Sequence, residues 1–307
     1  MYRAEMLFYG GDLNTSEILA YKAIYSAQEK KQAAVVLSAV LQLGHIALCK
    51  GDAEGWQRAI DALSLTNKDA KASALLQSTT DVLRGILLLK LTHPDTIADW
   101  LKTGDFERLA SLPYLCPFAH FVHAQYLCRQ GEFARLIGFA EASYPNGIET
   151  SPLLDALLAL VVATAYLNLN DKTKATALIQ YAADKTLPDG LIFLLLSYIH
   201  LLGGLLDQIA KKSYPACLPA FLKLKSRLNL AGRRLSQYTI TIVKPIGLPD
   251  DLTPKEKKVA LLAAQGLRNA EIAQRLSVTE NTVRYHLRSV FRKLDVGRRM
   301  KLAEKLS

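Results

Sequence analysis

The sequence predicts an all-α protein in which a series of helix pairs is followed by a small helix-turn-helix module. Three observations carry this prediction. Apolar residues recur at helical spacing almost throughout residues 1–236, with few runs of β-branched residues. Turn signals return in this region at intervals of about 40 residues. Between residues 252 and 294, three short amphipathic helices are predicted, separated by short turns.

Composition and charge divide the chain in the same way. A chain of 307 residues exceeds one ordinary domain, and 50% of it is apolar, so a large core can form. The net charge is +10, and residues 245–307, with 13 Lys and Arg against 7 Asp and Glu, carry +6 of it. This concentration of positive charge predicts a polyanionic partner for the C-terminal part.

A glycine or asparagine followed by an acidic residue marks the tight turn inside each predicted pair. These dipeptides are Gly11-Asp12, Gly51-Asp52, Gly131-Glu132 and Asn170-Asp171. The missing member of the series falls at residues 91–94, where we expect a slightly longer turn. Glycine or asparagine can end a helix in the left-handed conformation, and an acidic residue favours the start of the next helix. The breaks between pairs are predicted at Asn67-Lys68, Pro113, residues 145–152 and Pro188.

A helix pair cannot bury its own apolar face, so about five stacked pairs are expected to form one curved core with a superhelical groove. The turn pattern resembles tetratricopeptide repeats. We therefore assign residues 1–236 to a sensor or interaction domain that receives a small-molecule or protein effector. Residues 237–251 are interpreted as an extended linker, because Tyr238 to Val243 have strand composition and the Pro and Gly residues that follow block a helix.

The C-terminal module begins at a capping box. In Thr253-Pro254-Lys255-Glu256, a hydroxyl residue precedes a carboxylate by three positions, and this predicts a helix from Pro254 to about Gln265. A second helix is predicted from Asn269 to Leu276, with Ser277 to Thr279 as the turn. The third helix is predicted from about Glu280 to Leu294.

The predicted third helix has three faces at about 100° per residue. The apolar face contains Val283, Leu287, Val290, Phe291 and Leu294. The opposite face contains Asn281, Arg284, Tyr285, Arg288 and Arg292, and such a row of guanidinium and amide groups suits base edges in a major groove. The flank contains Thr282, His286, Ser289 and Lys293, where short polar groups and a lysine can contact phosphates. A cationic helix face is also common on solvated surfaces, so the other helices are needed to favour nucleic-acid binding.

Residues 252–303 resemble the LuxR-type DNA-binding domain. The motifs are Leu252-Thr253-x-x-Glu256, Gly266-Leu267-x-Asn269-x-Glu271-Ile272-Ala273, Thr282-Val283-Arg284-x-His286 and Lys293-Leu294-x-Val296-x-x-Arg299. The resemblance implies a four-helix domain whose third helix enters the major groove. It also implies a last helix, from about Arg298 to Leu306, that helps a homodimer form on DNA. By position, Arg284, Tyr285 and Arg288 are expected to contact bases, and Thr282 and Lys293 the DNA backbone.

The sequence departs from that family in its second and its last helix. Arg268 stands where a short hydroxyl residue usually caps the second helix, so the cap must move to Asn269 or be lost. In the last helix, Met300 and Leu302 replace the common threonine and alanine. The whole chain is similar to the sensor and output parts of MalT-like activators, which usually begin with a P-loop domain. No GxxxxGK[ST] motif occurs in this sequence, so we expect neither an ATP switch nor a cofactor.

Other chemistry is weakly supported. No Gly-x-Ser-x-Gly elbow or pair of carboxylates in an apolar setting is present, so an enzyme is the least expected class. Cys116, His120 and His123 share a helical face, but no fourth ligand accompanies them, and no metal is expected. The scattered cysteines suggest reduced core residues, and the absence of a leader or an unbroken apolar span suggests a cytoplasmic protein without a membrane segment.

The sequence therefore predicts a sequence-specific transcription regulator that binds double-stranded DNA, with RNA polymerase as a candidate partner. Activation is expected from the family resemblance alone. Two alternatives stay open at this point. The repeats could form a protein-binding scaffold whose C-terminal module mediates pairing or captures another regulator. The module could also act as a sigma-like promoter element, although no promoter-melting segment precedes it.

Overall fold

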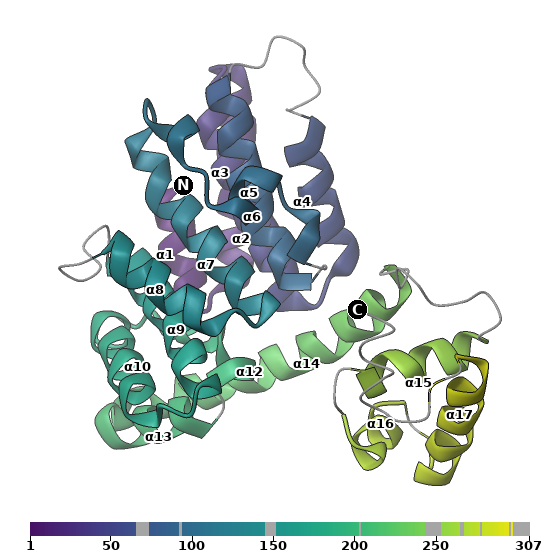
Figure 1. Cartoon of the computed structure of the whole chain (residues 1–307). Helices are drawn as coiled ribbons and strands as arrows, with labels where there is room; N and C mark the ends of the chain where they lie inside the picture. Colours follow the sequence, from purple (N-terminus) through teal and green to yellow (C-terminus); the bar gives the residue numbers. More distant parts are fainter. Residues whose placement is uncertain are drawn as a thin grey trace. The chain divides into compact units, whose positions relative to one another are not determined.

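The computed structural model describes residues 1–65, 74–91, 94–144, 152–202, 204–242, 253–264, 267–276, 278–294 and 296. These residues form helices and turns, and no strand occurs among them, which confirms the all-α prediction. Contacts divide the chain into two units, residues 1–236 and 237–307, and each is described by itself (Figure 1). The sensor role assigned to the first unit stays a prediction.

The first unit consists mainly of successive helix pairs. The pairs are α1 (Tyr2–Tyr9) with α2 (Leu13–Glu29), α3 (Ala33–Lys50) with α4 (Ala53–Leu65), α5 (Ala74–Leu91) with α6 (Asp99–Thr103), α7 (Cys116–Gln130) with α8 (Phe133–Ser143), and α9 (Pro152–Asn168) with α10 (Lys172–Thr186). The helices that follow are α11 (Ile192–Leu196), α12 (Ile199–Leu202), α13 (Gly204–Ser213) and α14 (Leu218–Ile242). The third pair is irregular, because α6 has only 5 residues and 3-10 turns surround it: η1 (Pro94–Thr96), η2 (Glu107–Leu109) and η3 (Pro113–Leu115). A fourth 3-10 turn, η4 (Pro215–Cys217), precedes α14.

The four turns predicted at 40-residue spacing share one hydrogen-bonding pattern. In each turn, the backbone N–H of the acidic residue donates to the carbonyl five residues earlier. These bonds are Asp12 to Leu7 (2.9 Å), Asp52 to Ala47 (2.9 Å), Glu132 to Leu127 (3.0 Å) and Asp171 to Tyr166 (2.9 Å). The preceding residues, Gly11, Gly51, Gly131 and Asn170, have φ between 61° and 91°. The turn prediction is therefore confirmed at these four places, whereas residues 92 and 93 lie outside the described residues.

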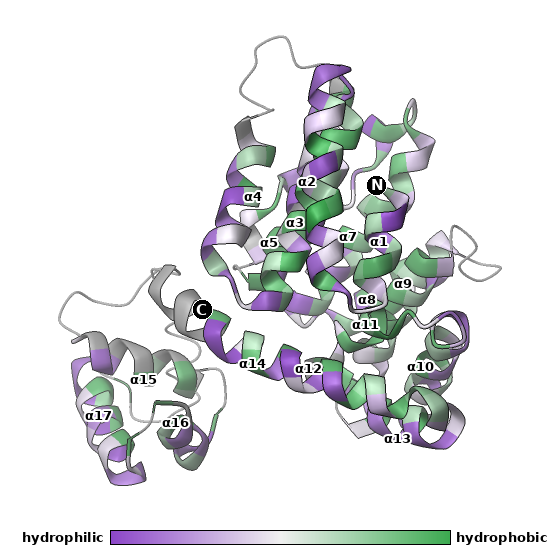
Figure 2. Ribbon diagram, turned by 180° about the vertical axis from the view of Figure 1, so that it is seen from behind, coloured by the Kyte–Doolittle hydropathy of each residue, from purple (hydrophilic) through white to green (hydrophobic). Residues whose placement is uncertain are grey.

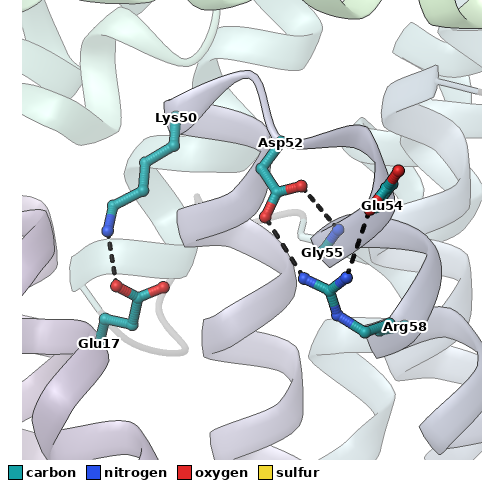
Figure 3. Close-up of polar contacts among 6 residues, drawn as sticks. All are labelled: Glu17, Lys50, Asp52, Glu54, Gly55 and Arg58. Atoms are coloured by element: carbon teal, nitrogen blue, oxygen red, sulfur yellow. Dashed lines mark hydrogen bonds and ion pairs between the residues drawn. The ribbon is translucent and has the colours of Figure 1, made fainter.

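The aspartates in these turns also cap the helix that follows. Asp52 accepts a hydrogen bond from the Gly55 N–H at 2.9 Å, which satisfies one of the free amides at the start of α4 (Figure 3). The side chains of Asp12 and Asp171 accept equivalent bonds from Thr15 and Lys174. One short dipeptide thus ends one helix and begins the next, which explains why this signal recurs in the sequence.

The first helix of this unit touches α11, which follows the last pair. The ring of Phe8 in α1 lies 4.9 Å from the ring of Phe193 in α11. α9 lies in the core, where it contacts α7, α8 and α10, and most of its residues from Leu154 to Ala165 are buried. The start of the series therefore contacts the helix that follows its last pair. Its expected winding into a superhelix with a groove stays a prediction.

The long helix α14 packs on the turns of the first two pairs. A Cβ atom at Gly11 would lie 2.7 Å from Leu224 Cδ2, and a Cβ atom at Gly51 would lie 3.0 Å from the Ala231 Cα. Glycine is required at both turns by the left-handed backbone, and at Gly51 also by the close approach of the α14 backbone. These contacts hold α14 against the start of the repeat.

The extended conformation expected for the start of the linker is wrong where the structure describes it. α14 continues as a helix to Ile242, so residues 238–242 are helical, and residues 243–251 lie outside the described residues. A helix that already spans five turns adds residues at little cost, even β-branched ones. A strand needs a neighbouring strand to pair its backbone, and the described residues provide none.

Among the described residues, one helix, α3, is long and apolar enough by length and composition to cross a membrane. Its buried Gln42 donates to the Ser16 hydroxyl at 3.2 Å, and that hydroxyl donates to the Ala4 carbonyl at 2.7 Å. Since α3 also packs between α2, α4 and α5, it serves as a core helix of the repeat.

The described part of the second unit contains α15 (Pro254–Ala264), α16 (Asn269–Leu276) and α17 (Glu280–Lys293). These bounds agree with the predicted helices to within one residue. The expected last helix, with Met300 and Leu302, lies outside the described residues. The apolar side chains that form the core are Val259, Leu262, Ile272, Ala273, Val283, Leu287, Val290, Leu294 and Val296. The inward face predicted for α17 is therefore confirmed, with Phe291 packed at its margin.

Each helix of this unit begins with a side-chain cap. The predicted capping box at α15 is present: the Thr253 N–H donates to Glu256 Oε2 at 2.8 Å, and the Glu256 N–H donates to Thr253 Oγ1 at 3.3 Å. At α16, Arg268 provides no hydroxyl, but its backbone N–H donates to Glu271 Oε2 at 2.6 Å. Half of the capping box is therefore kept at the position where the sequence lacks the hydroxyl residue.

The carboxylate of Glu256 also joins α15 to α17. Lys293 Nζ donates to Glu256 Oε2 at 2.8 Å, and the Glu256 side chain is only 7% exposed. Hydrogen bonds from Lys293, Ser289 and the Thr253 backbone lower the pKa of Glu256 to about 2. The sequence identified Glu256 only as a cap, because nothing local indicates its partner in α17.

Gly51 and Gly131 provide a matched test of how α14 is held. Both have left-handed backbones, but a Cβ atom at Gly131 would meet nothing within 4 Å. Gly131→Ala should therefore cost about 1 to 2 kcal/mol of unfolding free energy from backbone strain alone. Gly51→Ala should cost about 1 to 3 kcal/mol more, because α14 must move away. Denaturant unfolding of the two variants checks this, and equal losses would contradict the packing of α14 on the turn.

Glu256→Gln should destabilise the C-terminal module by about 1 to 3 kcal/mol near neutral pH, because a buried charged hydrogen bond is lost while the side-chain shape is kept. Since the pKa of Glu256 is lowered, its contribution is present above the ordinary value and is lost as pH falls from about 4.5 towards 2. The difference from wild type should shrink over that range. Hydrogen exchange of the α15 amides measures it, with Glu280→Gln as an exposed control expected to have little effect.

Candidate nucleic-acid interface

The outward side of α17 presents the polar side chains that the sequence placed there. Asn281, Arg284, Tyr285, Arg288 and Arg292 are all exposed, and Tyr285 is 72% exposed. Val283, Leu287 and Val290, which alternate with them along the chain, are buried. Figure 2 shows both hydrophilic and hydrophobic residues along α17. We call these five exposed residues the outer face of α17.

The caps of α17 fix where this face begins. Thr279 is the N-cap, and its hydroxyl accepts from the Thr282 N–H at 3.2 Å. The Thr279 and Thr282 hydroxyls are 2.9 Å apart, so the Thr282 side chain is partly engaged within its own helix turn. Asn281 and Thr282 therefore lie in the first turn of α17, where backbone amides and the positive end of the helix dipole favour an anion.

The arginines of the outer face are only weakly paired with carboxylates of the described residues. Arg284 Nη2 lies 3.4 Å from Glu280 Oε2, and the two side chains are 58% and 47% exposed. Its Nη1 is 3.4 Å from Asn281 Oδ1. Exposed pairs of this length contribute little, so the Arg284 guanidinium can exchange these contacts for others. Within the described part of the chain, Arg288 and Arg292 have no carboxylate partner.

The flank of α17 is more restrained than its outer face. Lys293 is held by Glu256, and the Lys293 side chain is 28% exposed. His286 and Ser289 are half-buried, and the His286 ring meets the Tyr285 ring edge-on at 5.7 Å. The structure thus brings together six of the seven predicted site residues on an accessible surface, whereas the Lys293 ammonium already has an internal partner.

His120 and His123, considered as metal ligands from the sequence, form other contacts in the first unit. His123 Nδ1 is 2.8 Å from the Leu101 carbonyl oxygen, and His120 Nδ1 is 3.1 Å from the Tyr144 hydroxyl. Burial lowers the pKa of both histidines. Both rings also pack against Phe106 and Phe139. Among the described residues, no group of three His, Cys, Asp or Glu side chains could hold a metal ion.

Comparison with known proteins concerns mainly the C-terminal module. Residues 250–306 match the family model described as "Bacterial regulatory proteins, luxR family". The nitrate/nitrite response regulator protein NarL of Escherichia coli is 41% identical over 54 residues, which are 18% of this chain and 25% of NarL. A putative HTH-type transcriptional regulator of Mycobacterium bovis is 43% identical over 53 residues, which are 17% of this chain and 6% of that protein.

A longer match is to the probable transcriptional regulatory protein SgaR of Hyphomicrobium methylovorum, 38% identical over 98 residues, which are 32% of this chain and 44% of SgaR. The chain thus spans less than half the length of the curated relatives it matches. No solved structure is similar to it. The matched family consists of DNA-binding transcription regulators and not of enzymes. The C-terminal module of this chain is therefore a LuxR-type helix-turn-helix domain.

Proposed function

We propose that this chain is a sequence-specific transcription regulator whose α17 enters the major groove of double-stranded DNA. The observation that supports this most strongly is the division of α17 into a buried apolar face and the exposed outer face of Asn281, Arg284, Tyr285, Arg288 and Arg292. A helix of this kind fits the major groove, and arginine and asparagine side chains recognise guanine and adenine edges.

Each polar residue has a proposed role. Arg284, Tyr285 and Arg288 lie at the middle of the outer face and contact bases. Asn281 and Arg292 lie at its two ends, where they contact bases or the adjoining phosphates. Thr282 contacts the DNA backbone from the first turn of α17, where the positive end of the helix dipole also attracts a phosphate.

Lys293 has two proposed roles. Its ammonium has three N–H donors and donates to Glu256, so it can contact a phosphate as well as α15. Removal of Lys293 is therefore expected to weaken binding to all duplexes alike, partly by loosening the module.

The rest of the chain is proposed to control the DNA-binding module. The module acts as a homodimer on DNA in the cytoplasm, and the chain activates transcription with RNA polymerase as a candidate partner. The repeat unit receives the effector, a small molecule or a protein. One observation supports a protein partner in addition to a small-molecule effector: α2 exposes Ile18 (66%), Tyr21 (47%) and Tyr25 (69%) at helical spacing along one stripe.

Selection of bound sequences from random duplexes tests the assignment of α17. The full chain should enrich a two-fold symmetric site. Arg284→Ala and Arg288→Ala should each lose about 1 to 3 kcal/mol of discrimination at particular base pairs, because a bidentate contact is removed. Lys293→Ala should lower the affinity for all duplexes.

Arg58→Ala provides the control, because Arg58 is an exposed arginine of α4 whose partners are Asp52 and Glu54 (Figure 3). This variant should bind like wild type. If Arg284→Ala and Arg288→Ala lowered the affinity for selected and random duplexes equally, the proposed reading of bases by α17 would be wrong.

A further inference from the structure

The first helices of several pairs bring a polar cluster together inside the repeat unit. We call it the Lys90 cluster, and it consists of His45, Cys49, Lys90, Gln125 and Tyr198. Lys90 Nζ, at the end of α5, lies 4.8 Å from the centre of the Tyr198 ring. Gln125 Nε2, in α7, donates to the Tyr198 hydroxyl at 2.7 Å. His45 and Cys49, in the last turns of α3, are close enough for the Lys90 charge to act on their pKa values.

Lys90 differs from its equivalent in the preceding pair. Lys50 precedes it by 40 residues, one repeat, and also lies in the last turn of a first helix. Lys50 Nζ pairs with Glu17 Oε2 at 2.6 Å (Figure 3). Among the described residues, Lys90 has no such carboxylate. At the same position of the repeat, the lysine of the second pair is thus neutralised by a carboxylate. The lysine of the third pair has no carboxylate among the described residues.

The described residues around Lys90 do not supply a negative charge. Burial is the main cause that lowers the pKa of Lys90 to about 8, and the Arg129 charge lowers it further. The nearby Cys49 is a neutral thiol at pH 7, because burial raises its pKa. Burial and the Lys90 charge together lower the pKa of His45 to about 3, so His45 is neutral as well. The dipole of α5 favours a cation at this end, but it does not replace a counter-ion.

Gln125 adds a second unsatisfied group. Its side chain is buried, with 6% of the residue exposed, and its Oε1 has no hydrogen-bond partner. Buried polar atoms in folded proteins are nearly always paired. Tyr198 thus connects the two groups. Its hydroxyl accepts from Gln125, whose Oε1 is the unpaired acceptor, and its ring face lies against the Lys90 ammonium.

We propose that the Lys90 cluster binds a small hydroxylated anion, whose carboxylate or phosphate pairs with the Lys90 ammonium while a hydroxyl group donates to Gln125 Oε1. This proposal deepens the proposed function, because it assigns the chemistry and place of the small-molecule effector. Both unsatisfied groups gain a partner of the type they lack.

The position of the cluster links it to α14. Cys49 is two residues before Gly51, the turn residue on which the α14 backbone packs at Ala231. In α1, Tyr9 precedes the Gly11 turn, which contacts Leu224 of α14, and the Tyr9 and Tyr198 hydroxyls interact electrostatically. An anion bound here therefore lies next to the two turns that seat α14.

Calorimetry on the full chain tests the proposal with three probes: glycerol 3-phosphate, glycerate and neutral glycerol. Wild type and Lys50→Met should bind one of the two anions at a ratio of one to one, and glycerol should not bind. Lys90→Met should bind the anion at least about tenfold more weakly. The two anions distinguish a phosphate from a carboxylate ligand.

A measurement on wild type alone keeps the test independent of whether Lys90→Met folds. Because the bound anion raises the pKa of Lys90 from about 8, binding at pH 8 should take up protons, and affinity should fall as pH rises from 7 to 9. Titration in two buffers of different ionisation heat measures this uptake.

Three results would overturn the proposal: no binding of either anion, equal binding by glycerol, or equal binding by Lys90→Met. Duplex binding by the same variants is measured separately. If wild type binds DNA but neither anion, the site is wrong and the proposed function stands. If wild type binds the anion but no DNA, the proposed function is wrong and the anion site stands.

Discussion

A single carboxylate, that of Glu256, connects the start of α15 to the end of α17. Its Oε2 accepts from the Thr253 backbone and from Lys293 Nζ, while Val283, Leu287 and Val290 bury the inward side of α17. The apolar contacts fix the rotation of α17 about its axis, and the Glu256 ion pair fixes its position along α15. Because both are fixed, the arginines between the buried residues must face outward. The proposed DNA recognition depends on that constraint.

The same tight turn recurs in the repeat unit with local changes in sequence. Each tight turn joins a left-handed residue to an acidic cap, so helix pairs can follow one another at a constant spacing. Positions one repeat apart can then take different roles on the same scaffold, as Lys50 and Lys90 do. The turns at Gly11 and Gly51 have acquired a further function, because they seat α14.

Features determined by neighbours in the sequence could be predicted. The turns at 40-residue spacing, the capping box at Thr253 and the inward face of α17 all depend on residues within a few positions of one another. Features determined by distant partners could not. The Glu256–Lys293 pair joins residues 37 positions apart, and the contact of Phe8 with Phe193 joins α1 to α11. The composition of residues 238–242 suggested a strand, but the local preference was too weak to end a helix that begins at Leu218.

The central claim is that the outer face of α17 binds DNA through free guanidinium groups and reads its sequence. The most direct test is the affinity of the full chain for a selected and a random duplex between 50 and 200 mM salt. If about four phosphates are contacted, both affinities should fall about 100-fold, and the selected duplex should bind more tightly throughout. An affinity that does not change with salt, or one that is equal for both duplexes at every salt concentration, would contradict the account.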